Sequence, residues 1–172
     1  MKKAVWSGII TAVGMLAMST SVYAQAQTAT GTVNVNANVN AKAKLTINGG
    51  ANASITFADA DPDVLATLPS APLNIAVKAR TSGTGAVTLT VRASQDLTSA
   101  TSDTIAITAL KWTSTGTNFA VSGISSTGAD VSVFSATGSG NHSGVQNYTL
   151  DNSWAYATGT YTTTLTYTLT AP

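Results

Sequence analysis

The 172-residue chain contains no cysteine and no glutamate, and only 9% of its residues are charged. Without cysteine it can form no disulfide, no thiolate metal site and no lipid-modified N-terminal cysteine. Its single histidine, His142, rules out a two-histidine metal site within one chain and lies among glycines and serines, a poor frame for a catalytic triad. Without glutamate, a glycosidase would need two aspartates, and the spacing singles out no such pair. We therefore expect a protein without enzymatic activity and without a cofactor.

Positive charge is also scarce. Lys2 and Lys3 account for two of the eight lysines and arginines, which leaves six against seven aspartates in the rest of the chain. This balance gives no indication of nucleic-acid binding. Most of the polarity comes from threonine, which favours strands, and from serine, asparagine and glycine, which favour turns. Such a composition is typical of a β-rich extracellular protein.

The N-terminus has the three parts of a secretory signal peptide. The basic residues Lys2 and Lys3 precede an apolar run over residues 4–17, and cleavage after Ala24 or Ala26 fits the preference for small residues. A membrane anchor is the alternative, but the run is shorter than the roughly 20 residues of a membrane span. We expect a protein secreted to the periplasm or the cell surface of a bacterium, with no membrane span after cleavage.

The clearest pattern in the chain is a strict alternation over residues 33–47. Its even positions are polar, and its odd positions are Val33, Val35, Ala37, Val39, Ala41, Ala43, Leu45 and Ile47. A period of two predicts a β-strand with one apolar face and one polar face. At about 3.3 Å per residue the run would span roughly 50 Å, against about 17–20 Å for an ordinary strand. It must therefore bend, break into two strands, or extend beyond its own domain.

Further short alternating segments follow, separated by turn signals. Strands are predicted over residues 55–57, 73–79, 86–93, 105–112, 119–122, 131–135, 145–150 and 161–169. Residues 73–79 and 86–93 are predicted to form a hairpin, and residues 136–144 a mobile loop of small residues. The fold class expected is all-β: an immunoglobulin-like antiparallel β-sandwich with Greek-key topology, and a jelly roll or a small barrel as alternatives.

Two groups of side chains are candidates for ligand contact. Asp59, Asp61 and Asp63 begin like a calcium loop, but Val64 replaces the required glycine and Ser70 the bidentate glutamate, so a solvated loop is the preferred interpretation. The second group is the aromatic pair Trp154 and Tyr156, which could stack on a sugar ring.

The first part of the alternating run is the strongest candidate for an assembly site. Val33, Val35, Ala37 and Val39 alternate with neutral asparagines, without the charge or proline that usually protects an edge strand. Such a segment is explained if it adds as a strand to a second copy, a head-to-tail contact that generates filaments. The domain division is then a signal peptide at 1–24, an N-terminal extension at 25–40 and a sandwich at 41–172. The alternative is one long, bent first strand that switches between the sheets of its own sandwich.

The C-terminus adds a family resemblance. The sequence closes with Gly159-Thr160-Tyr161 and an alternating strand, and together with the signal peptide, the N-terminal alternation and the strand carrying Trp112 it resembles chaperone–usher fimbrial subunits. The cysteine-free colonisation-factor type of major pilin is the most similar in layout, and spore-coat-U-like secreted proteins share the ending. Most pilins have a disulfide, which this chain lacks.

The resemblance implies a structural, adhesive role and a homo-oligomer formed by strand exchange. It also implies a periplasmic chaperone and an outer-membrane usher as partners, with Val33, Val35, Ala37 and Val39 as the inserting residues. Two other functions remain open. One is a monomeric carbohydrate- or surface-binding module that uses Trp154 and Tyr156, similar to WxL-type cell-wall domains although the leucine of that motif is missing. The other is a secreted hydrolase.

Overall fold

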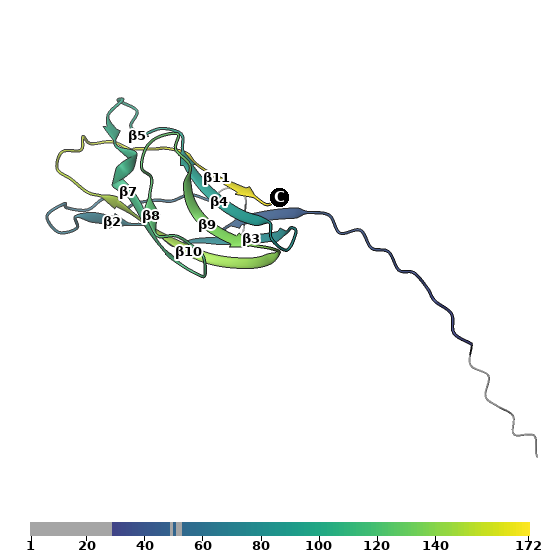
Figure 1. The fold of residues 1–172 in the computed structure, drawn as a ribbon. Helices are drawn as coiled ribbons and strands as arrows, with labels where there is room; N and C mark the ends of the chain where they lie inside the picture. The colour runs from purple at the N-terminus through teal and green to yellow at the C-terminus, as the bar shows by residue number, and fades with distance from the viewer. Residues whose placement is uncertain (1–28, 49, 51–52) are drawn as a thin grey trace, which may run out of the picture. The chain divides into compact units, whose positions relative to one another are not determined.

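The computed structural model describes residues 29–48, 50 and 53–172 (Figure 1). The predicted signal peptide lies outside the described residues. Residues Asn38–Pro172 form one compact unit. Among the described residues, no helix is long and apolar enough to cross a membrane.

The larger of two main sheets has six strands in the order β1-β3-β10-β7-β8, with β2 also paired to β10. All of its pairings are antiparallel. Its strands are β1 (Lys42–Ile47), β2 (Thr67–Pro69), β3 (Leu73–Arg80), β7 (Leu110–Thr115), β8 (Ser122–Gly123) and β10 (Gly140–Asp151).

The smaller sheet has three antiparallel strands in the order β11-β4-β9. They are β4 (Ala86–Ala93), β9 (Val131–Thr137) and β11 (Leu165–Thr170). A short two-stranded ribbon of β5 (Leu97–Thr98) and β6 (Thr104–Ile105) leads into η1 (Ile107–Ala109), the one helical turn in the described part of the chain. The predicted all-β antiparallel sandwich is confirmed.

The core lies between the two sheets and follows from the alternation of their strands. Ile75 and Val77 on β3, and Leu89 and Val91 on β4, are completely buried, while the residues between them face outward or are half-buried. In the larger sheet, the Trp112 ring on β7 packs against the Tyr148 ring on β10 at a centroid distance of 5.6 Å. Burial of this apolar surface is the main stabilising contribution in a chain without disulfides.

The predicted hairpin of residues 73–79 and 86–93 is wrong, although both strands exist. β3 pairs with β1 and β10 in the larger sheet, whereas β4 pairs with β11 and β9 in the smaller one. The turn between them crosses from one sheet to the other. Because both strands have a fully apolar face, they bury these faces against each other across the core, and periodicity alone does not distinguish this from side-by-side pairing.

The predicted single strand over residues 105–112 is also wrong. β6 ends at Ile105, η1 follows, and β7 begins at Leu110. The backbone N–H of Ile107 donates to the Asp96 carboxylate at 2.8 Å, and Ala109 N–H donates to the Ala106 carbonyl at 2.9 Å. Because this turn interrupts the strand, apolar residues at odd and at even positions of the run can both face the core.

Residues 136–144 are not a loop, because most of them belong to β9 and β10. The turn between the two strands contains Gly138 at φ 80°, which favours glycine. Gly144 is needed for a different reason: a Cβ there would lie 2.6 Å from Cδ2 of Phe119, whose ring packs on the Phe134 ring at 5.0 Å. The small residues therefore permit a turn and a close contact.

Candidate assembly interface

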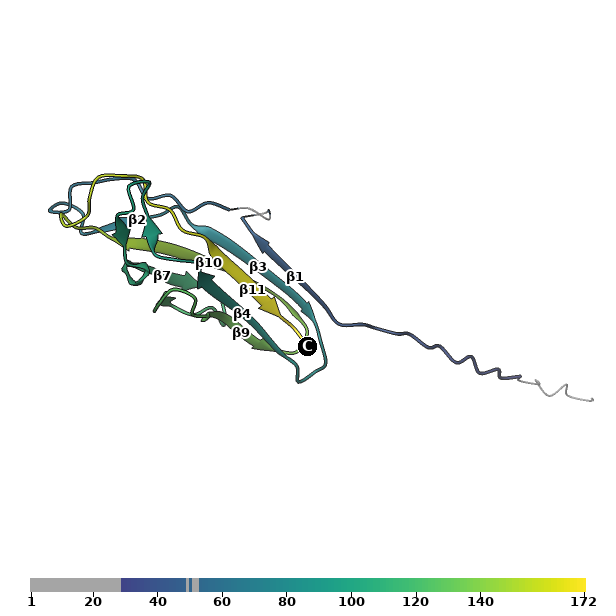
Figure 2. The same ribbon diagram turned by 90° about the horizontal axis from the view of Figure 1, so that it is seen from above.

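Two strands that end different sheets lie beside each other without pairing. β1 is the last strand of the larger sheet, outside β3 (Figure 2), and β11 is the last strand of the smaller one. The two strands are in contact. No ladder joins them within residues 29–48, 50 and 53–172. An edge strand in an antiparallel sheet directs about half of its N–H and C=O groups away from its partner. We call these two unpaired edges the open side of the sandwich.

The apolar side chains at the open side are incompletely covered. Leu165, Tyr167 and Leu169 on β11 pack against the core but are only half-buried, and the same is true of Leu45 and Ile47 on β1. On β3 and β4, one strand further in, the equivalent side chains are completely buried. The sandwich therefore has a row of half-exposed apolar side chains along this side.

The other side of the sandwich is closed by its own chain. Ala120 N–H donates to the Val133 carbonyl at 2.8 Å, and Ser135 N–H donates to the Asn118 carbonyl at 3.3 Å, so residues 118–120 cover the outer edge of β9. Trp112 Nε1 holds this segment by donating to the Ala120 carbonyl at 2.9 Å. No equivalent segment covers β11 in the described ranges.

The two edges of the open side differ in charge. β1 carries Lys42 and Lys44, and lysine is a common protection against unwanted strand pairing. β11 has no charged residue, and its exposed face consists of Thr166, Thr168 and Thr170. The β11 edge is therefore the one better suited to accept another strand.

A buried polar network lies behind the centre of β11. The Tyr167 hydroxyl donates to Gln146 Oε1 at 2.7 Å and lies 2.5 Å from the Tyr148 hydroxyl, so that Tyr148 donates to Tyr167. Gln146 Nε2 is buried and has no hydrogen-bond partner among the described residues. Burial raises the pKa of Tyr148 to about 12, against a weaker opposing effect of the Tyr167 hydrogen bond. Burial, followed by the neighbouring Tyr148, raises the pKa of Tyr167 as well.

The candidate donor segment is exposed. Val33, Val35 and Val39 are 86%, 87% and 65% exposed, and residues 29–41 belong to no strand. Because β1 begins at Lys42, the alternative of one strand over residues 33–47 does not hold for this part. The run also contains no glycine or proline that would turn it back on itself. We call residues 33–39 the ribbon.

Trp154, one of the two candidate aromatic residues, contacts the loop that carries Asp59, Asp61 and Asp63. Trp154 is 70% exposed, and its Nε1 donates to Oδ1 of Asp63 at 3.1 Å. Asp61 accepts the backbone N–H of Asp63 at 2.9 Å, so both carboxylates stabilise the loop. Within the part of the chain that the structure describes, no group of three histidine, cysteine, aspartate or glutamate side chains could hold a metal ion. Tyr156 is half-buried, and burial followed by the charge of Asp151 raises its pKa.

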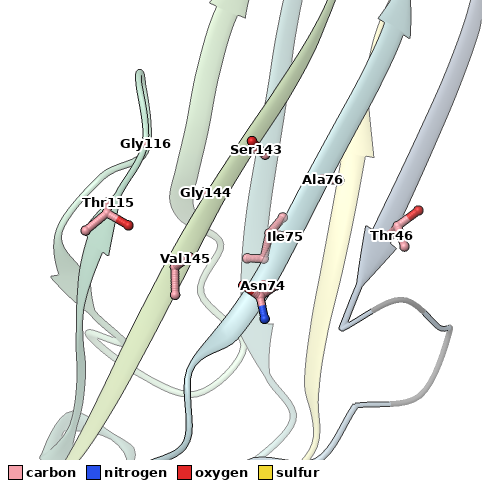
Figure 3. A pocket seen from close by; sticks show the side chains of 9 residues that line it. All are labelled: Thr46, Asn74, Ile75, Ala76, Thr115, Gly116, Ser143, Gly144 and Val145. Atoms are coloured by element: carbon pink, nitrogen blue, oxygen red, sulfur yellow. The ribbon is translucent and has the colours of Figure 1, made fainter.

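A hollow on the outer face of the larger sheet does not include these aromatic residues. Figure 3 shows that its lining comes from β1, β3, β7 and β10 and consists mainly of small or hydroxyl-bearing residues, among them Ala76, Ser143 and Thr115. It has neither an aromatic ring nor a charged side chain. Sugar-binding sites usually need a ring on which the sugar stacks, so this hollow is a poor ligand site.

Sequence reasoning singled out the ribbon as a candidate donor, which stays a prediction, but did not identify the surface that could receive it. The alternation over residues 161–169 marked an apolar face that includes Leu165, Tyr167 and Leu169, but alternation does not say whether a strand is central or at an edge. Sequence reasoning also did not predict that Lys42 and Lys44 lie opposite Arg80 and Lys78 on neighbouring strands. No protein-family model and no curated protein matches the chain.

Proposed function

We propose that this protein is a secreted structural subunit of a fimbria-like surface assembly, and that it polymerises by strand addition. The ribbon of one copy pairs with the open side of the next, along β11. The observation that carries the proposal is the row of half-exposed apolar side chains along an unpaired, uncharged edge. An additional strand there would satisfy the free N–H and C=O groups of β11 and cover the row.

The ribbon and β11 match in length and in side-chain size. Seven ribbon residues at about 3.3 Å each extend roughly 23 Å, close to the roughly 20 Å of the six residues of β11. On β11, the large Tyr167 lies between Leu165 and Leu169. In the ribbon, the small residue Ala37 lies between two valines. We propose that Ala37 is placed opposite Tyr167, where a larger side chain would not fit.

An uncovered β11 is also a hazard before assembly, because an exposed edge strand with apolar side chains promotes aggregation. A partner that occupies the open side during export would remove this hazard. The chaperone and usher implied by the resemblance to fimbrial subunits fit this need, and we include them in the proposal as partners.

The proposal is tested by removing the ribbon. The comparison is between residues 25–172 and residues 40–172, by sedimentation velocity and thermal melting, with and without a peptide spanning residues 32–41. We expect polymers from the longer chain, a monomer from the shorter one, and a rise in the melting temperature of the shorter one on adding the peptide. A peptide in which Val35 and Val39 are both replaced by aspartate is the control. Two equally stable monomers that ignore the peptide would contradict the proposal.

A second candidate function is favoured by one observation: Trp154 is 70% exposed and is hydrogen-bonded to Asp63, whose neighbour in the chain, Val64, is exposed as well. A monomeric carbohydrate- or surface-binding module could use this patch. The two functions are separated by a glycan-binding screen of the ribbon-deleted domain, with Trp154→Ala as the control. Binding that is lost in this variant would favour the module.

A further inference from the structure

Four of the six lysines and arginines beyond Lys3 lie together on one face of the larger sheet. The register of β1 and β3 places them in two directly opposed pairs: Lys42 faces Arg80, and Lys44 faces Lys78. All four are exposed, whereas Val77 and Ala79, which alternate with Lys78 and Arg80 on β3, are buried and half-buried. We call these four residues the basic face.

The basic face makes no ion pair within the described part of its own domain. Among the described residues the ion pairs join Arg92 to Asp130 and Lys111 to Asp151, and no carboxylate lies within 4.0 Å of the four cations. Like charges in direct cross-strand pairs destabilise a sheet. Four unpaired cations in a chain with so little charge therefore indicate a surface whose charge is balanced by a partner.

Three of the five aspartates that make no ion pair in the described structure lie together at the opposite end of the same domain. Asp59, Asp61 and Asp63 are exposed and make no ion pair in the described structure; we call residues 59–63 the acidic loop. Asn152, directly after β10, holds the loop by donating to the carbonyls of Ala60 and Leu65, both at 3.0 Å.

β10 separates the two charged ends. It begins at Gly140, which pairs beside the basic face with Ala79, and runs for 12 residues to the end that holds the acidic loop. At about 3.4 Å per residue this is roughly 40 Å. Figure 1 shows β2 and the C-terminus at these two ends of the sandwich. The domain is therefore positive at one end and negative at the other.

We propose that the basic face of one copy docks on the acidic loop of a second copy, and that this contact sets the direction of strand addition. The inference rests on the proposed function. Only residues 40 and 41 separate the ribbon from β1, so the ribbon enters the acceptor at the end to which the donor's basic face is docked. That end is the one with the acidic loop.

This direction fixes the polarity of the new strand pair. β11 runs toward the basic end, because the C-terminal Pro172 accepts a hydrogen bond there from Thr81, directly after β3. The C-terminal residue of the ribbon, Val39, lies at the acidic end of the acceptor. The ribbon therefore runs from the basic end to the acidic end, opposite to β11. It therefore pairs antiparallel with β11, the more stable of the two arrangements.

The test is a charge swap in residues 25–172. Lys78→Glu and Asp63→Lys are made singly and together, and Arg92→Glu is the control with the same charge change as Lys78→Glu. Elongation of preformed seeds is followed by light scattering at low and high ionic strength. We expect each single variant to elongate about tenfold more slowly at low salt, because steering between opposite charges is lost. We expect the double variant to recover to within about threefold of the unaltered chain, and salt to reduce the differences.

Several outcomes would overturn the inference. It fails if Lys78→Glu is no slower than Arg92→Glu, or if the double variant is as slow as the single ones. It also fails if Lys78→Glu abolishes binding to heparin or to anionic phosphatidylglycerol vesicles without changing elongation, since the basic face would then serve a polyanion. Peptide binding by residues 40–172 carrying Lys78→Glu separates the two proposals. If Lys78→Glu changes neither peptide binding nor the elongation rate, only the charge contact is refuted. If the unaltered domain does not bind the peptide, strand addition and the inference are refuted together.

Discussion

Tyr148 on β10 and Tyr167 on β11 join their hydroxyls at 2.5 Å, and so connect the two sheets directly behind the open side. Tyr167 also donates to the buried Gln146 at 2.7 Å. β11 has β4 as its only ladder partner in the described structure, and this network adds side-chain hydrogen bonds that join β11 to the larger sheet. It holds the β11 edge in place on the sandwich.

Replacing Tyr167 by phenylalanine is expected to destabilise the domain by about 1–2 kcal/mol, because Gln146 Oε1 loses its short hydrogen bond inside the core. The measurement is urea unfolding of residues 40–172. Tyr161→Phe is the matched control, since the Tyr161 hydroxyl donates to the exposed Ala157 carbonyl. We expect the control to change the free energy of unfolding by less than about 0.5 kcal/mol. Equal losses in the two variants would show that the network is not stabilising.

Alkaline pH is expected to weaken the same network. An unfolded tyrosine loses its proton near pH 10, whereas burial raises the pKa of Tyr148 to about 12 in the folded domain. Between these values the folded state binds more protons than the unfolded state, so the free energy of unfolding falls as the pH rises. The contribution is complete below about pH 10 and is lost as the pH passes through about 12.

The pH dependence is measured by urea unfolding of residues 40–172 between pH 8 and pH 12. In Tyr148→Phe the decline above pH 10 should be shallower than in the unaltered domain, while Tyr161→Phe serves as the control and should leave it unchanged. A decline of equal steepness in all three proteins would mean that the buried tyrosines do not cause it.

Gly144→Ala is expected to destabilise the domain by about 1–3 kcal/mol, since the new methyl group would overlap the Phe119 ring. Gly83→Ala is the control, because nothing lies within 4 Å of the position its Cβ would take. Thermal melting of the two variants compares them directly. If Gly144→Ala melts at the same temperature as Gly83→Ala, the close packing of Phe119 on β10 is not important for stability.

Ala37→Phe is expected to prevent polymerisation if Ala37 lies opposite Tyr167, because two large side chains would compete for one space. Asn38→Phe adds a similar side chain to the other face of the ribbon and should leave polymerisation within about threefold of normal. Sedimentation velocity of residues 25–172 reports both. Polymerisation of Ala37→Phe at the normal rate would contradict the proposed register.

Alternation predicted where the strands lie better than how they pair. Residues 73–79 and 86–93 were identified almost to the residue, because Ile75, Val77, Leu89 and Val91 alternate strictly and are all buried. Their pairing with each other was wrong, since pairing depends on which apolar faces meet across the core, and that is decided by the whole chain.

Two further differences have local causes. In residues 105–112, the Asp96 hydrogen bond to the Ile107 backbone turns the chain in the middle of an apolar run. In residues 136–144, the small residues are compatible with a mobile loop, but they also allow Phe119 to pack on Gly144, and composition alone does not distinguish the two. The sequence singles out the ribbon as a candidate because it alternates without protection. The open side and the basic face were not, because they depend on which strands end the sheets and on the register of β1 with β3.

The most direct measurement is amide hydrogen exchange of β11 in residues 40–172, with and without the peptide spanning residues 32–41. If the ribbon adds to this edge, the β11 amides that face the open side become strongly protected when the peptide binds, while amides on β9 at the closed side change little. If the peptide leaves the exchange of Leu165, Tyr167 and Leu169 unchanged, or protects only residues outside the open side, strand addition at β11 is contradicted.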